Sequence, residues 1–222
     1  MTDLPPLGRY TGRPRSVRTL ERLGREQLSK HFYMRNFLYS EIGAIEGIRN
    51  VPDDPTLALT AGRMLATTLL EPLVETFGPI EVRSSYRAPA VNEFGNRHGL
   101  NCASTEANRA GHTWDALDAE GRMGACACIV IPWFAGRFEA GRDWRDLAWW
   151  LHDHLDYHAI TFFARRAAFN LTWREAPERG ISSWIGPTRS LLRFGEEPSE
   201  PLEDRRRRYA DFPPFRGIAY PE

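Results

Sequence analysis

The residue types that could do chemistry gather between positions 82 and 131. This segment runs from the apolar PIEVR into the turn SSYRAPAVN and the loop AGHTWD, and it ends in GACACIVI. The pattern predicts two strands joined by a turn and a loop that carry polar side chains, and binding sites are often built at such strand ends. The turn supplies Arg87 and Asn92, and the loop supplies His112.

His112 is the first candidate for a metal ligand or a catalytic base. An imidazole can hold a metal ion, and Asp115 or Asp118 could reach the same cation from the same loop. Cys128, on the following apolar run, could bind zinc as a thiolate. The alternative is a buried histidine that is hydrogen-bonded beside Asp115.

Arg87 is the candidate for binding a negative charge. A planar guanidinium suits a carboxylate or an oxyanion, because it donates two parallel hydrogen bonds. The alternative is an arginine that pairs with a nearby acid such as Glu106 and holds the loop in place.

The same segment resembles the zinc D-Ala-D-Ala carboxypeptidase family, whose fold is shared with the Hedgehog signalling domain. In that family a strand ends in a Ser-Gly-Tyr-Arg-Ser-Pro-like turn, matched here by Ser84-Ser85-Tyr86-Arg87-Ala88-Pro89, with Asn92 at the usual place. The resemblance covers roughly residues 30 to 175. It implies a substrate-binding set of Ser85, Tyr86, Arg87, Asn92 and Trp173.

The second motif of that family, Ser-x-His-x-x-Gly-x-Ala-x-Asp, supplies a histidine and an aspartate to zinc. His112 matches the histidine, whereas Ala110 replaces the serine and Asp115 the first glycine. If Ala116 to Met123 is a short insertion, Cys128 stands at the aspartate position. Without an insertion that position falls on Ala119, with Asp118 one residue earlier. The metal set that the resemblance implies is therefore His112, Asp115 and Cys128.

The last motif is a pair of strands that gives the general base and the third zinc ligand. The nearest counterparts are AITFFA and FNLTW, which place Phe162 at the base and Asn170 at the ligand. A second register places Arg174 at the ligand position. In both registers the third ligand is missing, and Glu106 or Glu175 would have to act as the base from another direction.

The three family zinc positions also read as the residue types of a thiol hydrolase. Cys128 would be a thiolate activated by His112, and Asn170 would orient the imidazole. The alternative is a small core cysteine in an apolar strand. The catalytic candidates are therefore Arg87, Cys128 and Asn170.

The resemblance implies a divergent metallohydrolase that acts on peptide or amide substrates of the peptidoglycan type, with zinc as the candidate cofactor. The alternative is a catalytically inactive relative that serves as a binding or structural component, for example of a phage-like particle. The turn keeps Tyr86, Arg87 and Asn92, and the loop keeps His112, whereas the general base is lost. This combination favours a cleft that kept its shape for binding and changed its chemistry. Whether the protein is an enzyme stays open.

Composition limits the partners. The 222 residues carry 29 Lys plus Arg and 29 Asp plus Glu, so no net charge attracts nucleic acid or an anionic membrane. The first 15 residues lack a signal-like apolar core, and no run approaches the roughly 18 apolar residues of a membrane span. We expect a cytoplasmic protein, or one released or assembled without a signal peptide. The three cysteines are too few and too close for a disulfide framework.

The chain is expected to form one domain with two arms. Residues 1–24 read as an irregular N-terminal arm, 25–195 as a peptidase-like domain, and 196–222 as a tail of prolines, arginines and aromatics. Either arm could contact a protein partner. The tail is expected to lie across the body of the protein or a neighbouring subunit, anchored by Phe212, Phe215 and Tyr220.

Periodicity predicts helices over 28–42, 55–77 and 142–158, and strands over 80–83, 124–131, 159–164 and 169–173. These elements favour an α+β fold, and the resemblance to the D-Ala-D-Ala carboxypeptidase and Hedgehog fold implies a small, mostly antiparallel sheet with helices packed on one side. His154 and His158 are four residues apart on the last helix and could share a metal, or they could form its solvated face.

Overall fold

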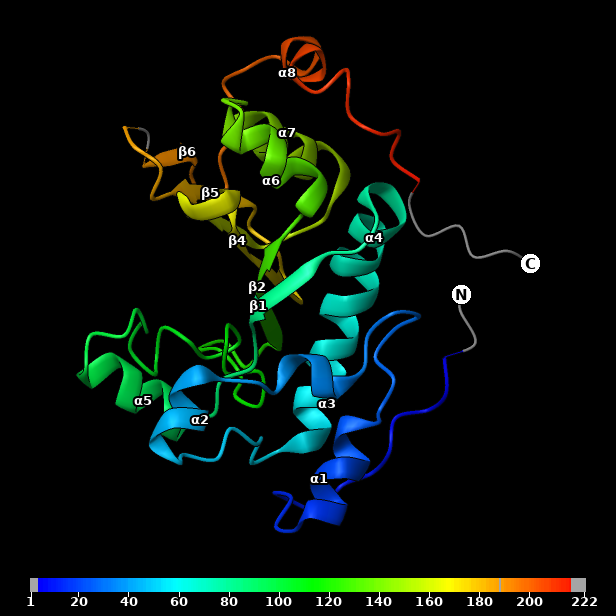
Figure 1. Ribbon diagram of the computed structural model, residues 1–222, viewed down its shortest axis with the longest axis vertical. Coiled ribbons are helices and arrows are strands. Elements are labelled where there is room, and N and C mark those ends of the chain that lie inside the picture. Colours follow the sequence, from blue (N-terminus) through cyan, green and yellow to red (C-terminus); the bar gives the residue numbers. More distant parts are fainter. Residues whose placement is uncertain (1–3, 188, 217–222) are drawn as a thin grey trace.

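The computed structural model describes residues 4–187 and 189–216 and has an α+β architecture, with helices packed on a six-stranded sheet (Figure 1). The strands are β1 (Glu81–Ser84), β2 (Gly124–Val130), β3 (Ala159–Phe162), β4 (Phe169–Arg174), β5 (Gly180–Ser183) and β6 (Ser190–Leu192). Their order in the sheet is β1-β2-β4-β3-β5-β6. The predicted strands are confirmed, and β5 and β6 are added to them.

The sheet is mixed, which corrects the expected mostly antiparallel sheet. β3 and β5 pair in parallel, whereas β1–β2, β2–β4, β4–β3 and β5–β6 pair antiparallel. β5 follows β4 in the chain but pairs with the edge of β3 that faces away from β4. It runs antiparallel to β4 and therefore parallel to β3. The last two strands thus extend the sheet away from β1.

The helical elements are α1 (Val17–Gly24), η1 (Met34–Phe37), α2 (Glu41–Glu46), α3 (Pro55–Leu65), η2 (Ala66–Leu70), α4 (Glu71–Phe77), α5 (Pro89–Arg97), α6 (Pro132–Glu139), α7 (Trp144–His154), η3 (Arg165–Ala167) and α8 (Leu202–Arg208). α3, the π-helical η2 and α4 form one continuous helix, Pro55–Phe77, which confirms the prediction. The Asp54 side chain accepts from the amides of Thr56 and Leu57 at its start, and Gly78 ends it with a φ of 83°.

The main core lies between one face of the sheet and the helices α3, α4 and α7. Alternation along β2 turns Ala125, Ala127 and Ile129 toward this core, and the alanines leave room for α3 to approach closely. Trp150 of α7 packs edge-on against Phe77 of α4, with ring centroids 4.6 Å apart. The opposite face of β2 carries Cys126, Cys128 and Val130, and there Cys128 and Val130 pack with Ala135 and Ala168 in a second, smaller cluster.

Two expectations near the N-terminus were wrong. The helix expected over 28–42 is replaced by η1 and α2, because Ser40 begins a new helix by accepting from the amide of Gly43. Residues 17–24 form α1, although the first 24 residues were expected to be irregular. A capping box between Ser16 and Thr19 starts this helix.

The described part of the tail packs across the body, as expected, and includes α8. Arg205 of α8 pairs with Asp153 of α7 at 2.7 Å, and both side chains are buried. Tyr209 and Phe212 are also buried, and Phe215 packs against the rings of Trp150 and His154. Tyr220 lies outside the described residues.

Within the described ranges, Pro55–Phe77 is the one helix long and apolar enough to cross a membrane. However, 61% of its most apolar window is buried inside the domain, as in the core helix of a soluble protein. A mostly buried helix of this kind is only weak evidence for a membrane span among the described residues.

Candidate functional site

A cavity of about 380 Å³ lies on the outer face of the sheet, where the turn after β1 meets the loop that carries His112. Six of the predicted site residues line it: Ser85, Tyr86, Arg87, His112, Cys128 and Asn170. The other lining residues are Tyr39, Ser40, Glu41, Ile42, Arg83, Ser84, Leu100, Asn101 and Phe163. The structure thus brings Arg87 and His112 to one cleft.

Strand register explains how residues far apart in sequence meet in this cavity. Ser84 of β1 is opposite Cys128 of β2, and Cys128 is opposite Asn170 of β4. Paired residues in a sheet point to the same face. Cys128 and Asn170 therefore lie side by side, on the face away from the core.

His112 is held rigidly against the turn after β1. Its Nδ1 lies 2.7 Å from the carbonyl oxygen of Ser85, and its own carbonyl accepts from the amide of Arg87 at 2.8 Å. The hydroxyl of Thr113 donates to the carbonyl of Arg87 at 3.2 Å. These contacts fix the loop and the turn as one unit.

Burial, followed by the nearby Arg87 guanidinium, lowers the pKa of His112 to about 4. The imidazole is therefore neutral at pH 7. A carbonyl oxygen can only accept, so Nδ1 carries the proton and donates to Ser85, and Nε2 keeps its lone pair. Nε2 can accept a hydrogen bond or bind a metal ion.

The cavity has an excess of positive charge. Among the described residues, neither Arg83 nor Arg87 forms an ion pair with a carboxylate, and Glu41 is the one acid among the lining residues. Nη1 of Arg87 donates to Oδ1 of Asn92 over 3.4 Å, a long contact that leaves most of the guanidinium donors unused. Such a pair of arginines attracts an anionic ligand.

Cys128 is buried, and burial raises the pKa of its thiol, although Arg83 and Arg87 act in the opposite direction. Cys128 and His112 share no hydrogen bond in the described structure. The arrangement of a thiolate activated by a histidine is thus not formed here, because the thiol stays protonated and has no base in contact.

Asn92 and Trp173, both predicted to bind substrate, do not line the cavity. Asn92 is fully buried on α5, accepts from Asn108 Nδ2 at 2.8 Å and donates to the carbonyl of Ala103 at 3.2 Å. It supports the loop after α5, in which Leu100 and Asn101 line the cavity. Trp173 is buried in the main core, on the opposite face of β4 from Asn170.

The predicted acids are used elsewhere. Asp115 accepts from the amides of Asp53 and Asp54 at 2.6 and 3.4 Å, and from the Tyr86 hydroxyl at 3.1 Å. It ties the start of α3 to the turn after β1 and is absent from the residues that line the cavity. Asp118 pairs with Arg122 at 2.9 Å.

The general base stays unidentified. Phe162 is fully buried in the core. Glu175 accepts from the amide of Met123 at 2.7 Å, and neither it nor Glu106 lines the cavity.

The two histidines of the α7 region have separate environments. His154 stacks on Trp150 with ring centroids 4.6 Å apart, and its Nδ1 lies 2.8 Å from the Trp150 carbonyl. His158 lies beyond the end of α7, stacks on Phe194 and accepts from the amide of Glu178 at 3.3 Å. Each ring already has its own partners.

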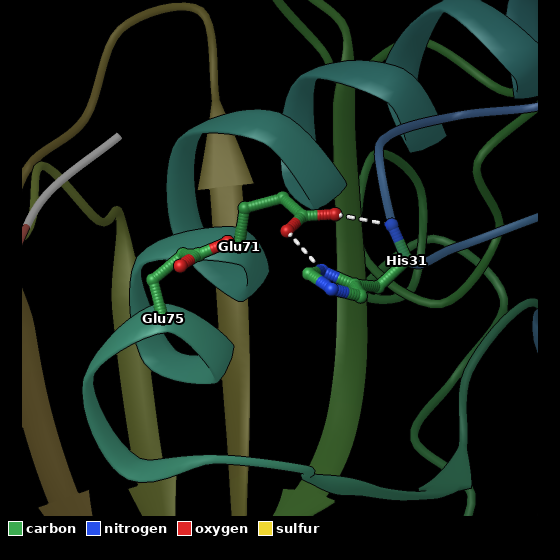
Figure 2. Close-up of side chains that lie close together, drawn as sticks. All are labelled: His31, Glu71 and Glu75. Atoms are coloured by element: carbon green, nitrogen blue, oxygen red, sulfur yellow. Dashed lines mark hydrogen bonds and ion pairs between the residues drawn. The ribbon is translucent and has the colours of Figure 1, made fainter. Parts of the chain in front are cut away.

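A different group was not anticipated from the sequence. His31 faces Glu71 of α4, and Glu75 lies one helical turn further along (Figure 2). The ligand atoms of the three residues lie within 4.8 Å of one another, so the group could hold a metal ion. Both oxygens of Glu71 are already engaged, since they accept from the amide and Nδ1 of His31 at 2.7 Å each. Lys30 pairs with Glu75 at 2.8 Å. Two glutamates four residues apart on an apolar helix were the available signal.

Comparison with known proteins finds no relative of this chain. The resemblance to the zinc D-Ala-D-Ala carboxypeptidases therefore depends on the residues of this cavity. No family model matches the chain, and no curated protein or solved structure matches it.

Proposed function

We propose that this protein binds the carboxylate end of a peptide-like ligand in the cavity of His112 and Arg87. It would be a divergent relative of the zinc D-Ala-D-Ala carboxypeptidases that keeps the cleft and lacks the hydrolytic groups. The observation that carries the proposal is Arg87, a cavity-lining guanidinium without a carboxylate partner in the described structure.

Charge and geometry support this choice of ligand. Arg83 and Arg87 outnumber the single lining acid, Glu41, so a carboxylate entering the cavity meets uncompensated positive charge. Arg87 can bind that carboxylate through two parallel hydrogen bonds. The lone pair on Nε2 of His112 can accept an amide N–H of the same ligand.

The volume and walls of the cavity suit a short peptide end. At about 380 Å³ it is at the small end of the ligand-pocket range, which is roughly 300–1,000 Å³. Ile42, Leu100 and Phe163 give it apolar walls beside the arginines. A carboxylate flanked by small apolar side chains matches this lining.

A metallohydrolase is the second candidate, and one observation favours it. His112, Cys128 and Asn170, at the family zinc positions, line one cavity. The donor set nevertheless does not fit a catalytic zinc, which needs three good ligands and a nearby carboxylate. An amide is a poor zinc ligand, the Cys128 thiol has a raised pKa, and Glu41 is exposed on α2.

The test compares binding of N-acetylated tripeptides that end in D-Ala-D-Ala or L-Ala-L-Ala, each as the free acid and as the C-terminal amide. A charged hydrogen-bonded pair contributes about 1.5–3 kcal/mol. For the stereoisomer that binds more tightly, the free acid should therefore bind about 10- to 100-fold more tightly than the amide. Arg87→Ala should remove this preference. Arg193→Ala, an exposed arginine on the far side of β6, is the matched control and should keep it. Equal binding of acid and amide by the unmodified protein would refute the proposal.

A further inference from the structure

Small polar side chains form a row across the outer face of the sheet, one from each strand. The register pairs Ser84 with Cys128, Cys128 with Asn170, Asn170 with Thr161, Thr161 with Ser182, and Ser182 with Ser190. The residues next to them in sequence, such as Leu171, Ile160 and Ile181, point to the opposite face and into the core. The first three members of the row line the cavity.

Beyond the cavity this row is accessible. Thr161 and Ser182 are partly exposed, and Ser190 is exposed. The hydroxyls of Thr161 and Ser182 lie 2.9 Å apart, and each retains hydrogen-bonding capacity toward solvent. No member of the row is charged, so the row itself is a neutral, small and polar floor across β4, β3, β5 and β6.

Aromatic side chains flank this floor on both sides. Phe163 follows β3 and Trp184 follows β5, and the amide of Trp184 donates to the carbonyl of Phe162 at 2.8 Å, which continues the ladder between the two strands. Trp184 is 65% exposed. On the other side the ring of Phe194, 54% exposed, covers Gly180, where an added Cβ would lie 2.7 Å from that ring. Glycine at this position lets Phe194 lie against the sheet.

We infer that the ligand of the cavity is an extended peptide that continues from Arg87 across β4, β3 and β5, between Trp184 and Phe194. This inference depends on the proposed function, because the carboxylate in the cavity sets the position of the peptide. Five strand spacings of about 4.8 Å give a floor of about 24 Å, which matches about seven extended residues.

The chemistry of the floor matches a peptide backbone. Hydroxyl and carboxamide groups both donate and accept, as the N–H and C=O groups of a peptide require. Small side chains leave room for the backbone to approach, and the exposed rings can pack against alternate side chains of the ligand. Arg83 and Arg87 line the cavity end of the row, so the carboxylate is expected there, whereas Arg189 near the other end lies over the ring of Trp184, 5.1 Å from its centroid.

The experiment compares an N-acetylated tripeptide with an N-acetylated octapeptide that has the same C-terminal residues and a free carboxylate. The octapeptide should bind the unmodified protein at least about 10-fold more tightly. Trp184→Ala removes one flanking ring, and Ser182→Arg obstructs the floor. Both variants should abolish the gain from length and leave the affinity for the tripeptide unchanged. Ser199→Arg, at an exposed bend outside the row, is the matched control.

The outcomes separate this inference from the proposed function. Equal affinity for the two peptides, or a gain from length that survives in Ser182→Arg and Trp184→Ala, would overturn the extended path. In that case binding that depends on Arg87 would still support the proposed function. If neither peptide binds the unmodified protein, both proposals are wrong. Thermal unfolding of each variant verifies that it is folded.

Discussion

The carbonyl oxygen of Ser85 accepts a hydrogen bond from Nδ1 of His112 across 2.7 Å. Because a carbonyl has no proton to give, this contact selects the tautomer in which Nε2 is unprotonated. Ser85 belongs to the same turn as Arg87, so one short turn orients both the imidazole and the guanidinium. The cavity therefore pairs a neutral acceptor with a fixed cation.

We expect stability to fall in mild acid because of three buried histidines. Burial lowers the pKa values of His112, His152 and His158 to about 4, whereas the ordinary value is 6.5. Between these pH values the unfolded chain binds protons that the folded protein does not, so the free energy of unfolding decreases as pH falls from 6.5 to 4. Each histidine should contribute on the order of 2 kcal/mol.

Urea unfolding at pH 7 and pH 5 measures this loss. His112→Gln removes one titrating group without adding a charge, so the difference between the two pH values should be smaller in this variant. A stability that is constant between pH 7 and pH 5 would contradict the assignment of neutral, buried rings.

Gly62 should tolerate no side chain. A Cβ at this position of α3 would lie 2.5 Å from the ring of Trp114, which is fully buried. Gly62→Ala should therefore lower the free energy of unfolding by about 1–3 kcal/mol. The control is Gly136→Ala on α6, where nothing lies within 4 Å, and it should be neutral or raise stability by up to about 1 kcal/mol. Similar unfolding free energies for the two variants would show that Trp114 can move aside.

The C-terminal segment should stabilise the domain through Arg205. This buried guanidinium pairs with Asp153 at 2.7 Å, so Arg205→Ala would leave a buried carboxylate without its main partner. The expected loss is about 2–4 kcal/mol. Arg207→Ala removes an exposed pair with Asp204 and should change stability by less than about 0.5 kcal/mol. Chemical denaturation of the two variants decides whether α8 is part of the folded unit or only rests on it.

Metal binding, where it occurs, can be assigned to one of two groups. If zinc binds at His112 and Cys128, His112→Ala should abolish it, and His154→Ala and His158→Ala should retain it. If zinc binds instead at the second group, His31→Ala should remove it, since His31 and Glu71 share that site. Elemental analysis of the four purified variants distinguishes these cases. Retention of metal in both His112→Ala and His31→Ala would place it at neither group.

We expect no turnover of D-Ala-D-Ala peptides through zinc and water. That reaction needs a carboxylate within hydrogen-bond reach of the metal-bound water, and loss of such a base costs about 100- to 10,000-fold in rate. Glu41 is the one described acid that lines the cavity, and it is exposed on α2. Release of free D-Ala with added zinc is the assay. Rapid release that disappears in Glu41→Gln would identify Glu41 as the base and restore the hydrolase.

The sequence by itself determined the main strands and the long core helix. β1, β2, β3 and β4 follow from runs of apolar residues, and Pro55–Phe77 follows from helical spacing between Asp54 and Gly78. These signals are local, because side-chain periodicity and capping act over a few residues. The turn that carries Tyr86 and Arg87 was recognisable for the same reason. The signal for α1 is equally local, because Ser16 and Thr19 form the capping box that begins it.

Only the tertiary structure decided which of the candidate residues meet. Strand pairing placed Cys128 beside Asn170, and it assembled the polar row from Ser84 to Ser190 out of all six strands. Asp115 stands three residues from His112, yet it accepts hydrogen bonds from the amides of Asp53 and Asp54, just before α3. Pairing between strands and contacts across loops join residues far apart in the chain, so no local pattern encodes them. The sequence named the groups of the cavity, and folding selected which of them share it.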